Sequence, residues 1–268
     1  MKKCELCASS RYQKIYSFPE GDIYLCQKCG LGFFHGAPFE DKYQEYKEGK
    51  SLRFAKRFFL YLEFGNLKKK KELKILEIGS GSGELAYYLS SAGHKVTCCD
   101  ISEKSLNLIR QKYHLKTICG KIEDISLPEN YFDIILMRHV IEHLDEPIYC
   151  IKKLYTALKK DGSLYITTPN YDSWARRIAR KKWNWCIPDH RYFWSTRTLA
   201  RFLYKQGFQI VRIKHIFTHN GISRALDNLC PLPLKHLTRP LTFTLGLTLE
   251  LLSIACYKGQ NLFIEARK

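Results

Sequence analysis

Apolar residues recur along this chain in short continuous runs that turn-forming residues interrupt. Four of these runs are Ile75 to Ile78, Val96 to Cys99, Phe132 to Met137 and Leu164 to Ile166. Runs of this length, rich in Ile, Leu and Val, are typical of buried strands. A last run at Asn261 to Ala266 predicts a further strand near the end of the sequence.

Helical segments are predicted between these runs. They cover Gly83 to Ser91, Ser102 to Tyr113, Glu146 to Lys159 and Thr196 to Gln206. Ser102 is a typical N-cap residue, and Pro147 suits the first turn of a helix. Ser195 or Thr196 is expected to cap the last of these helices. Strands and helices therefore alternate over the middle of the chain.

A glycine-rich turn follows the first strand, with the sequence Gly79-Ser80-Gly81-Ser82-Gly83 and with Glu77 just ahead of it. Glycines let a ligand approach the backbone, and the next helix offers free N–H groups. A carboxylate beside them would repel a dinucleotide pyrophosphate, whereas S-adenosylmethionine carries an ammonium and a sulfonium. The second strand ends at Asp100, where this architecture places an acid on the ribose hydroxyls.

These motifs occur in the order seen in class I S-adenosylmethionine-dependent methyltransferases, which residues 73–208 resemble. The third element of the resemblance is the sequence Arg138-His139-Val140-Ile141-Glu142-His143-Leu144 after the third strand. The resemblance implies a Rossmann-like, doubly wound α/β fold, whose seven-stranded sheet has an antiparallel last strand. The same fold with another ligand is the alternative, because fold alone does not determine function.

The resemblance also implies cofactor contacts. Glu77 is expected to face the methionine ammonium, Asp100 the ribose, and Ile101 the adenine ring. Ile122 and Glu123 are expected on the adenine side, although relatives often carry an acid where this chain has Lys121, and Glu123 is alternatively an exposed residue. The full predicted set is Glu77, Gly79, Ser80, Gly81, Gly83, Asp100, Ile101, Ile122, Glu123, Met137 and Arg138.

Three histidines are candidate catalytic bases: His139, His143 and His190. Methyl transfer from a sulfonium requires an aligned nucleophile and, for a hydroxyl, removal of its proton. Glu142 and His143 are alternatively structural residues at the start of the next helix. His190 lies in the aromatic segment Trp183 to Ser195, which in relatives covers the acceptor pocket; plain packing is the alternative.

Four of the eleven cysteines form two pairs, Cys4-x-x-Cys7 and Cys26-x-x-Cys29. This spacing is typical of a tetrahedral structural Zn²⁺ site, and a short polar ribbon needs such a metal in order to fold. We therefore expect a zinc ribbon over residues 1–36, with reduced cysteines and no metal as the alternative. His35 is expected to be a surface residue. A closed site of four cysteines argues against catalysis by this metal.

The predicted organisation has three parts. Residues 1–36 form the zinc ribbon, residues 37–72 a linker and helical region, and residues 73–268 the methyltransferase domain with a helical insertion around 220–258. An amphipathic helix is expected at Ser51 to Leu62, followed by the basic run Lys68 to Lys71. The apolar segment Pro240 to Tyr257 is expected to be a core or interfacial helix, because Glu250 lies near its middle.

The formal net charge is +18. It predicts an anionic acceptor, either a small molecule or a nucleotide-linked or lipid-linked compound, with peripheral contact to an anionic membrane or RNA as further options. A basic surface with no specific partner is the alternative. Candidate basic groups are Lys159-Lys160, Arg176-Arg177 and Arg180-Lys181-Lys182. The start of the chain, Met1 to Cys7, has no apolar run behind it, which predicts a cytoplasmic protein, with membrane association as an option.

The leading hypothesis is a methyltransferase that acts on a hydroxyl of a sugar, polyketide or quinone-like acceptor. A ribosomal RNA base methyltransferase is the second hypothesis, since some combine a zinc ribbon with this domain. A non-catalytic scaffold on membrane or nucleic acid is the third. Methyltransferases of nucleotide-linked deoxysugars share the ribbon, but they carry a further C-terminal domain that this chain lacks room for, which argues against carbon methylation.

Overall fold

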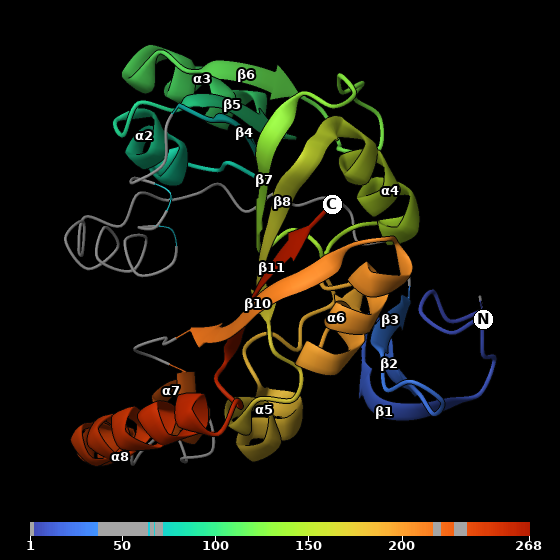
Figure 1. Ribbon diagram of the computed structural model, residues 1–268. Coiled ribbons are helices and arrows are strands. Elements are labelled where there is room, and N and C mark those ends of the chain that lie inside the picture. Colours follow the sequence, from blue (N-terminus) through green and yellow to red (C-terminus); the bar gives the residue numbers. More distant parts are fainter. Residues whose placement is uncertain (1–2, 37–63, 65–66, 68–71, 217–220, 228–234) are drawn as a thin grey trace. The chain divides into compact units, whose positions relative to one another are not determined.

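The computed structural model describes residues 3–36, 64, 67, 72–216, 221–227 and 235–268 (Figure 1). The predicted helix at Ser51 to Leu62 and the run Lys68 to Lys71 lie outside the described residues.

A seven-stranded mixed sheet is the centre of the fold, with the strand order β10-β11-β8-β7-β4-β5-β6. The neighbours β4 and β5, β4 and β7, and β5 and β6 are parallel, and the last strands are antiparallel. This confirms the predicted Rossmann-like sheet. The strands are β4 (Lys74–Ile78), β5 (Lys95–Asp100), β6 (Lys116–Cys119), β7 (Phe132–Arg138), β8 (Leu158–Pro169), β10 (Gln209–Ile216) and β11 (Asn261–Arg267).

The four predicted helices are present. They are α2 (Glu84–Ser90), α3 (Glu103–Tyr113), α4 (Pro147–Ala157) and α6 (Thr196–Lys205). Ser102 caps α3 by accepting the Ser105 N–H, and Ser195 caps α6 within a capping box. Pro147 occupies the first turn of α4. The capping predictions are confirmed because each depends on residues within one helical turn.

The predicted end of the third helix was wrong by two residues. Helix α4 ends at Ala157, and Leu158 already has extended backbone angles (φ −71°, ψ 140°) at the start of β8. Lys159 and Lys160 therefore lie in a strand rather than in a helix. Lys159 Nζ bonds the Asp133 carboxylate at 2.7 Å, which gives this basic residue a partner outside the helix.

The described residues group into two compact units. The first draws on residues 1–40, 141–145 and 166–265, and the second on residues 41–140, 146–165 and 266–268. In the second unit, α2 packs on β5, and α3 packs on β5 and β6. Asp133 accepts the Lys74 N–H at 2.8 Å, which fixes the start of β4 beside β7.

A small antiparallel sheet lies in the first unit, with the order β1-β2-β3-β9. Its strands are β1 (Tyr12–Phe18), β2 (Gly21–Cys26), β3 (Gly32–Gly36) and β9 (Tyr192–Phe193). Gly32 pairs with Phe193, and a Cβ on Gly32 would lie 2.9 Å from the Phe193 Cβ. The N-terminal ribbon is therefore continuous with the aromatic segment that contains His190.

The remaining helices of the first unit are α5 (Trp174–Ala179), η2 (Arg180–Lys182), α7 (Gly221–Asp227) and α8 (Lys235–Ala255). Helices α7 and α8 pack together (Figure 1). Glu250 of α8 is 1% exposed, and its carboxylate accepts the Ile222 N–H at 3.2 Å. The segment predicted as a core or interfacial helix is thus a helix that buries this carboxylate. Among the described residues, no helix has the length and apolarity that a membrane span requires.

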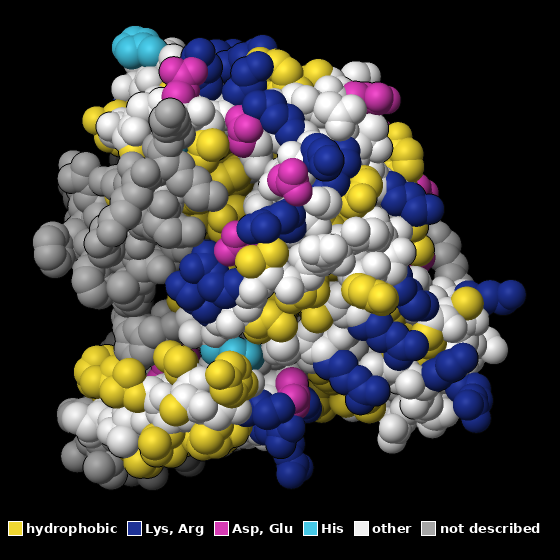
Figure 2. Space-filling model, viewed as in Figure 1, with side chains coloured by type: hydrophobic (Ala, Val, Ile, Leu, Met, Phe, Trp, Pro, Cys, Tyr) yellow, Lys and Arg dark blue, Asp and Glu magenta, His cyan; other side chains and the backbone are white. Residues whose placement is uncertain are grey.

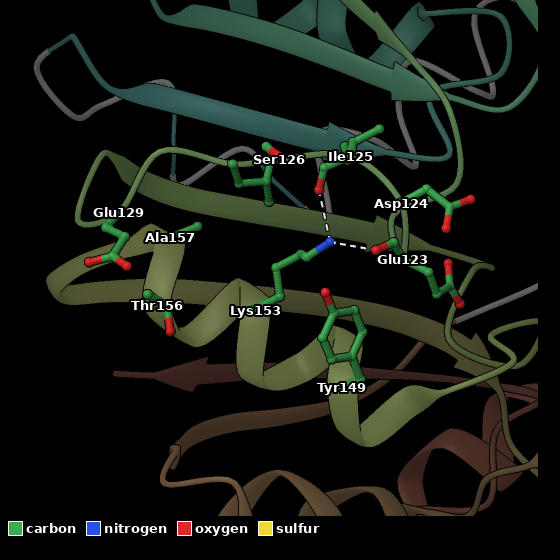
Figure 3. Close-up of a pocket in the computed structure, with 10 residues that line it drawn as sticks. Glu123, Asp124, Ile125, Ser126, Glu129, Tyr149, Lys153, Thr156 and Ala157 are labelled. Carbon is green, nitrogen blue, oxygen red and sulfur yellow. Dashed lines mark hydrogen bonds between the residues drawn. The ribbon is translucent and has the colours of Figure 1, made fainter.

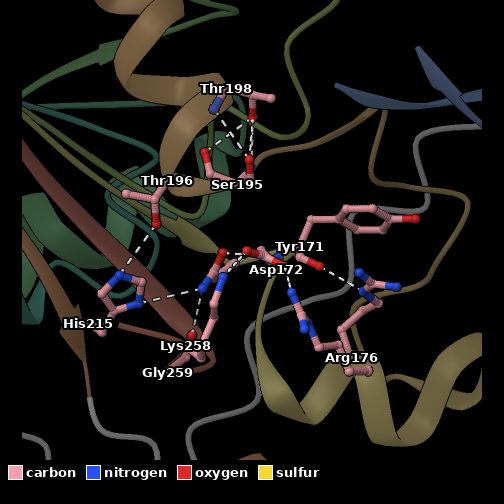
Figure 4. Close-up of polar contacts among 11 residues, drawn as sticks. Tyr171, Asp172, Arg176, Ser195, Thr196, Thr198, His215, Lys258 and Gly259 are labelled. Carbon is pink, nitrogen blue, oxygen red and sulfur yellow. Dashed lines mark hydrogen bonds and ion pairs between the residues drawn. The ribbon is translucent and has the colours of Figure 1, made fainter. Parts of the chain in front are cut away.

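A polar network connects the residue after β8, helix α6, strand β10 and the segment before β11 within the first unit (Figure 4). His215 Nε2 lies 3.3 Å from Thr196 Oγ1, and its Nδ1 lies 3.4 Å from Asn170 Nδ2. Asn170 also donates to the Gly259 carbonyl at 3.0 Å. Burial lowers the pKa of His215 below its ordinary 6.5, which favours the neutral form of the ring.

Candidate functional site

The glycine turn between β4 and α2 has the backbone that its glycines permit. Gly79, Gly81 and Gly83 all have positive φ, at 70°, 49° and 70°. A Cβ on Gly79 would lie 2.4 Å from Val140 Cγ2, and one on Gly83 would lie 2.6 Å from Ile109 Cγ1. A Cβ on Gly81 would meet no atom within 4 Å. Gly81 therefore borders open space that a ligand can enter.

Asp100 holds this turn from the end of the neighbouring strand. Its Oδ2 accepts the Gly81 N–H at 2.8 Å, and its Oδ1 accepts the Ser102 N–H at 2.9 Å. The side chain is 5% exposed. Each carboxylate oxygen has lone pairs beyond these bonds, so Asp100 can also accept bonds from ribose hydroxyls.

Glu77 is the buried acid beside the turn. It is 3% exposed, and its Oε2 has no hydrogen-bond partner among the described residues. Burial raises the pKa of Glu77 to about 8, and the nearby Asp100 carboxylate adds to this rise. Arg138 and the Ala86 N–H act in the opposite direction. A buried carboxyl group with an unsatisfied oxygen is suited to a cationic ligand, which would favour its charged form.

The end of β7 supplies three predicted residues. Met137 is fully buried, and Arg138 lies with its Cζ 5.9 Å from the Phe64 ring centroid. His139 follows with a φ of 53°. A positive φ in a residue other than glycine is uncommon and marks a constrained turn. All three residues belong to the second unit, as do Glu77 and Asp100.

The two hydrophobic residues predicted on the adenine side differ in exposure. Ile101 is 47% exposed and follows Asp100 directly, so its side chain is available to cover a flat ring. Ile122 is 4% exposed. The loop containing Ile122 is held by Lys153 of α4, which donates to the Ile122 carbonyl at 3.0 Å. Lys153 also donates to the carbonyls of Glu123 and Ile125 at 2.6 and 2.8 Å (Figure 3).

Glu123 is partly buried and hydrogen-bonds the Cys150 side chain. It also lines an open pocket beside α4, together with Asp124, Glu129, Tyr149 and Lys153 (Figure 3). None of the glycine-turn residues lines this pocket. The pocket therefore does not coincide with the space beside Gly81, and the adenine role of Glu123 stays a prediction.

Two of the three candidate histidines lie together in the first unit. The rings of His143 and His190 have centroids 4.8 Å apart and planes at 79°. One carboxylate oxygen of Glu142 and one nitrogen of each ring lie within 4.8 Å of one another. We call Glu142, His143 and His190 the Glu-His cluster. His139 belongs to the second unit.

Two partners of this cluster were not recognised from the sequence. His143 Nδ1 lies 2.9 Å from the Asp189 carbonyl oxygen and 3.3 Å from its carboxylate, and Thr168 donates to Glu142 Oε2 at 2.9 Å. Burial lowers the pKa of His143, but the bond to Asp189 and the Glu142 charge outweigh it and raise the pKa above 6.5. The only signal in the sequence is that Asp189 precedes His190 directly.

Glu142 and His143 do not cap the next helix. Glu146 is the N-cap residue of helix α4, and its side chain makes no capping hydrogen bond. Residues 141–143 form a turn rather than a helix, so His139 and His143 do not lie on one helical face. Capping by these two residues is not among the described contacts of α4, and a bracing role at the start of this helix stays a prediction.

The four predicted cysteines meet in the first unit as the cysteine cluster, Cys4, Cys7, Cys26 and Cys29. Their sulfurs all lie within 4.8 Å of one another, with 3.5 Å between Cys4 and Cys29 and between Cys7 and Cys26. Gly30 has a φ of 82° after the second pair, as expected of a tight knuckle. His35 is an exposed residue of β3 outside this cluster.

Comparison with known families assigns the fold. A family model described as methyltransferase domain matches residues 43–213, more than half of the chain. The chain belongs to this methyltransferase-domain family. The match includes Glu77, the glycine turn, Asp100, the Glu-His cluster and Asp189.

Curated relatives match the methyltransferase domain only in part. The chain is 35% identical over 103 residues to the malonyl-acyl-carrier-protein O-methyltransferase of Priestia megaterium, covering 37% of each chain. It is 33% identical over 106 residues to the ubiquinone biosynthesis O-methyltransferase of Pelagibacter ubique, covering 37% of this chain and 43% of that protein. The chain thus spans about two fifths of the length of these relatives.

Solved structures share the fold of the methyltransferase domain. An S-adenosylmethionine-dependent methyltransferase from Archaeoglobus fulgidus has a TM-score of 0.56 at 19% identity, covering 80% of this chain and 94% of that chain. A methyltransferase from Thermotoga maritima described as a possible histamine N-methyltransferase has a TM-score of 0.55 at 23% identity, covering 81% and 96%. At these identities the likeness concerns the fold alone.

Proposed function

We propose that this protein transfers the methyl group of S-adenosylmethionine to an oxygen of a small-molecule acceptor. The observation that carries the proposal is the buried Glu77 carboxyl group beside a glycine turn whose N–H is held by Asp100. The two acids suit the ammonium and the ribose hydroxyls of this cofactor. The family match and the O-methyltransferase names of the partial relatives support it.

The residues fit the cofactor by their chemistry. Glu77 would hold the ammonium, Asp100 the ribose, and the exposed Ile101 one face of the adenine. Gly79, Ser80, Gly81 and Gly83 shape the turn, while Met137 and Arg138 would line the methionine side. When bound, the cofactor supplies an electrophilic methyl group on a sulfonium.

The histidines are proposed to act on the acceptor. A hydroxyl attacks well only as its oxygen loses the proton, so a nearby imidazole that accepts this proton assists the step. His190 and His143 are the main candidates because their rings are in contact and Asp189 orients His143. His139 remains a third candidate, from the turn after β7.

We also propose that the acceptor is anionic, with a nucleotide or lipid phosphate as the simplest source of charge. The net charge of +18 supports this, and Lys and Arg side chains are spread over the described surface in Figure 2. Two of the basic residues around α5 are already paired within the protein, so this group offers less positive charge to an acceptor than its sequence suggests. Arg176 donates to the Tyr171 carbonyl at 2.7 Å, and Arg177 pairs with Asp172 at 2.6 Å (Figure 4).

The cysteine cluster is proposed to hold a structural Zn²⁺. The fit is supported by the backbone: N–H groups of Leu6 and Cys7 bond the Cys4 sulfur, and those of Lys28 and Cys29 bond Cys26. Such bonds stabilise thiolates, which are the form that zinc binds. With four sulfurs as ligands, this ion would have no open position for a substrate.

The proposed function is tested by isotope-labelled methyl transfer. Purified protein and labelled S-adenosylmethionine are incubated separately with soluble metabolites, lipid extract and RNA from cells, and Glu77→Gln protein is the control. Label that enters metabolites or lipids with the wild type alone supports the proposal. Label that enters RNA instead would show that the acceptor is RNA rather than a small molecule. No transfer in any fraction would contradict the enzymatic function.

A further inference from the structure

The Glu-His cluster is a group of metal-ligand type that is distinct from the cysteine cluster. Its three potential ligand atoms, one carboxylate oxygen and two imidazole nitrogens, lie within 4.8 Å of one another. All three residues belong to the first unit. Two imidazoles and one carboxylate are a donor set that binds divalent transition metals in proteins.

His143 is oriented as metal-binding histidines are. Its Nδ1 lies 2.9 Å from the backbone carbonyl oxygen of Asp189 and 3.3 Å from the Asp189 carboxylate. A carbonyl oxygen only accepts hydrogen bonds, so Nδ1 carries the proton in this contact. The lone pair is therefore on Nε2, and an acidic residue behind Nδ1–H is the usual outer partner of such a ligand.

The Glu142 carboxylate is also held in place. Its side chain is 1% exposed, and Oε2 accepts the Thr168 hydroxyl at 2.9 Å. The backbone of the same turn is fixed by the Tyr192 N–H, which donates to the Glu142 carbonyl at 3.1 Å. A hydrogen bond to one oxygen leaves lone pairs on the carboxylate for a cation.

His190 has little freedom to turn. The ring is 2% exposed and stacks on Trp185 with a centroid distance of 5.7 Å and an interplanar angle of 13°. The ring of His143 packs against it edge-on. Ligands that packing and hydrogen bonds hold in advance lose little freedom when a metal binds.

We propose that Glu142, His143 and His190 bind one divalent transition-metal cation. Metal–ligand bonds of about 2.1 Å place two ligands of one ion roughly 3 to 4 Å apart. Closing the present set to such distances needs side-chain shifts on the order of 1 Å. A cation would also balance the buried Glu142 carboxylate.

One consequence rests on the proposed function. With three protein ligands the cation keeps open positions, and an acceptor hydroxyl bound there loses its proton to solvent more readily. In that case His143 and His190 would hold the cation, in place of the proton-acceptor role proposed for them above.

The test is a titration of the full-length protein with Mn²⁺, followed by electron paramagnetic resonance of the free ion. Mn²⁺ prefers nitrogen and oxygen ligands, so the cysteine cluster, loaded beforehand with one zinc per chain, does not compete. We expect one Mn²⁺ per chain in the wild type. The variants Glu142→Gln and His190→Gln should bind Mn²⁺ at least tenfold more weakly than the wild type. The Mn²⁺ affinity of Thr168→Val should lie between those of these variants and the wild type.

His35→Gln is the matched control, because it removes an exposed imidazole outside the cluster. It should bind Mn²⁺ as the wild type does. Circular dichroism and S-adenosylmethionine binding check that each variant is folded. If a cluster variant is not folded, Glu142→Asp is used in its place. The proposal is overturned if folded wild type binds no Mn²⁺, or if the cluster variants bind it as tightly as His35→Gln. Methyl transfer that persists without Mn²⁺ binding would leave the proposed function intact.

Discussion

Asp100 accepts the backbone N–H of Gly81 at 2.8 Å, so the acid at the end of β5 fixes the turn after β4. The same carboxylate accepts the Ser102 N–H at the start of α3. One side chain therefore positions two backbone segments and still has lone pairs for a ligand. This places a charge-specific contact beside the open space at Gly81.

Replacing this acid should weaken cofactor binding. In Asp100→Asn, the amide NH₂ must face one of two backbone N–H donors, and the charge that favours the ribose hydroxyls is lost. We expect S-adenosylmethionine affinity to fall about 10- to 100-fold, since hydrogen bonds to charged groups contribute about 1.5–3 kcal/mol. Calorimetry measures this. Asp22→Asn, the same change in the N-terminal ribbon, should leave affinity unaltered, and equal affinity in both variants would remove Asp100 from the site.

Glu77 should make stability and binding depend on pH in opposite ways. Its folded pKa of about 8 lies above the ordinary 4.5, so the folded state holds a proton that the unfolded state releases between these values. Its contribution to the stability of the ligand-free protein therefore falls as pH rises from about 4.5 to 8. A cationic cofactor prefers the ionised form, so affinity should rise over the same window.

Glu77→Gln separates these two effects. The neutral side chain removes the charge that burial disfavours, so the melting temperature of the variant relative to wild type should increase from pH 5 to pH 9. Cofactor binding should be lost throughout. The measurement is thermal unfolding across this pH range without ligand, with calorimetry at each pH. A difference in melting temperature that does not change with pH would contradict a buried, proton-binding Glu77.

The glycines of the turn should respond differently to alanine. Gly81→Ala adds a Cβ to open space and costs about 1–2 kcal/mol for its positive φ, but it should lower cofactor affinity by filling that space. Gly79→Ala also meets Val140 at 2.4 Å and should destabilise the protein more. Urea unfolding and calorimetry measure both. The pair Gly79→Ala with Val140→Ala should recover part of the stability; no recovery would show that the contact is unimportant.

The sequence was most informative where contacts are local. Glu77, the glycine turn and Asp100 follow from strand–turn–helix order, and the N-caps Ser102 and Ser195 act within one turn of helix. The partners of the Glu-His cluster come from distant segments: Asp189 lies 46 residues from His143, and Thr168 lies 26 residues from Glu142. No periodicity in the sequence predicts such contacts, because only tertiary packing brings these residues together.

The two-residue strand β9 illustrates the same limit. Tyr192 and Phe193 lie in the segment that was expected to cover the acceptor, and they pair with Phe33 and Gly32 of the ribbon. A strand of two residues is too short to leave an alternating pattern. The end of α4 was missed for a related reason, since Lys159 is a good helix former whose partner Asp133 lies in another strand.

Removal of the metal should lower the stability of the ribbon and of the sheet that contains β9. We expect one zinc per chain in the wild type. Cys26→Ser should lose this zinc and have a lower melting temperature, because a short ribbon depends on its metal for folding. Cys256→Ser changes an exposed cysteine outside the cluster and should keep both zinc and stability. Metal analysis and thermal unfolding measure this. Zinc-free wild-type protein of unchanged stability would argue that the cysteines need no metal.

The most direct test of cofactor binding at Glu77 is isothermal calorimetry of S-adenosylmethionine with the wild type and Glu77→Gln, near pH 8. We expect one cofactor per chain in the wild type and no measurable binding in the variant. A folded wild type that binds no cofactor, or a variant that binds as tightly as the wild type, would contradict cofactor binding at Glu77.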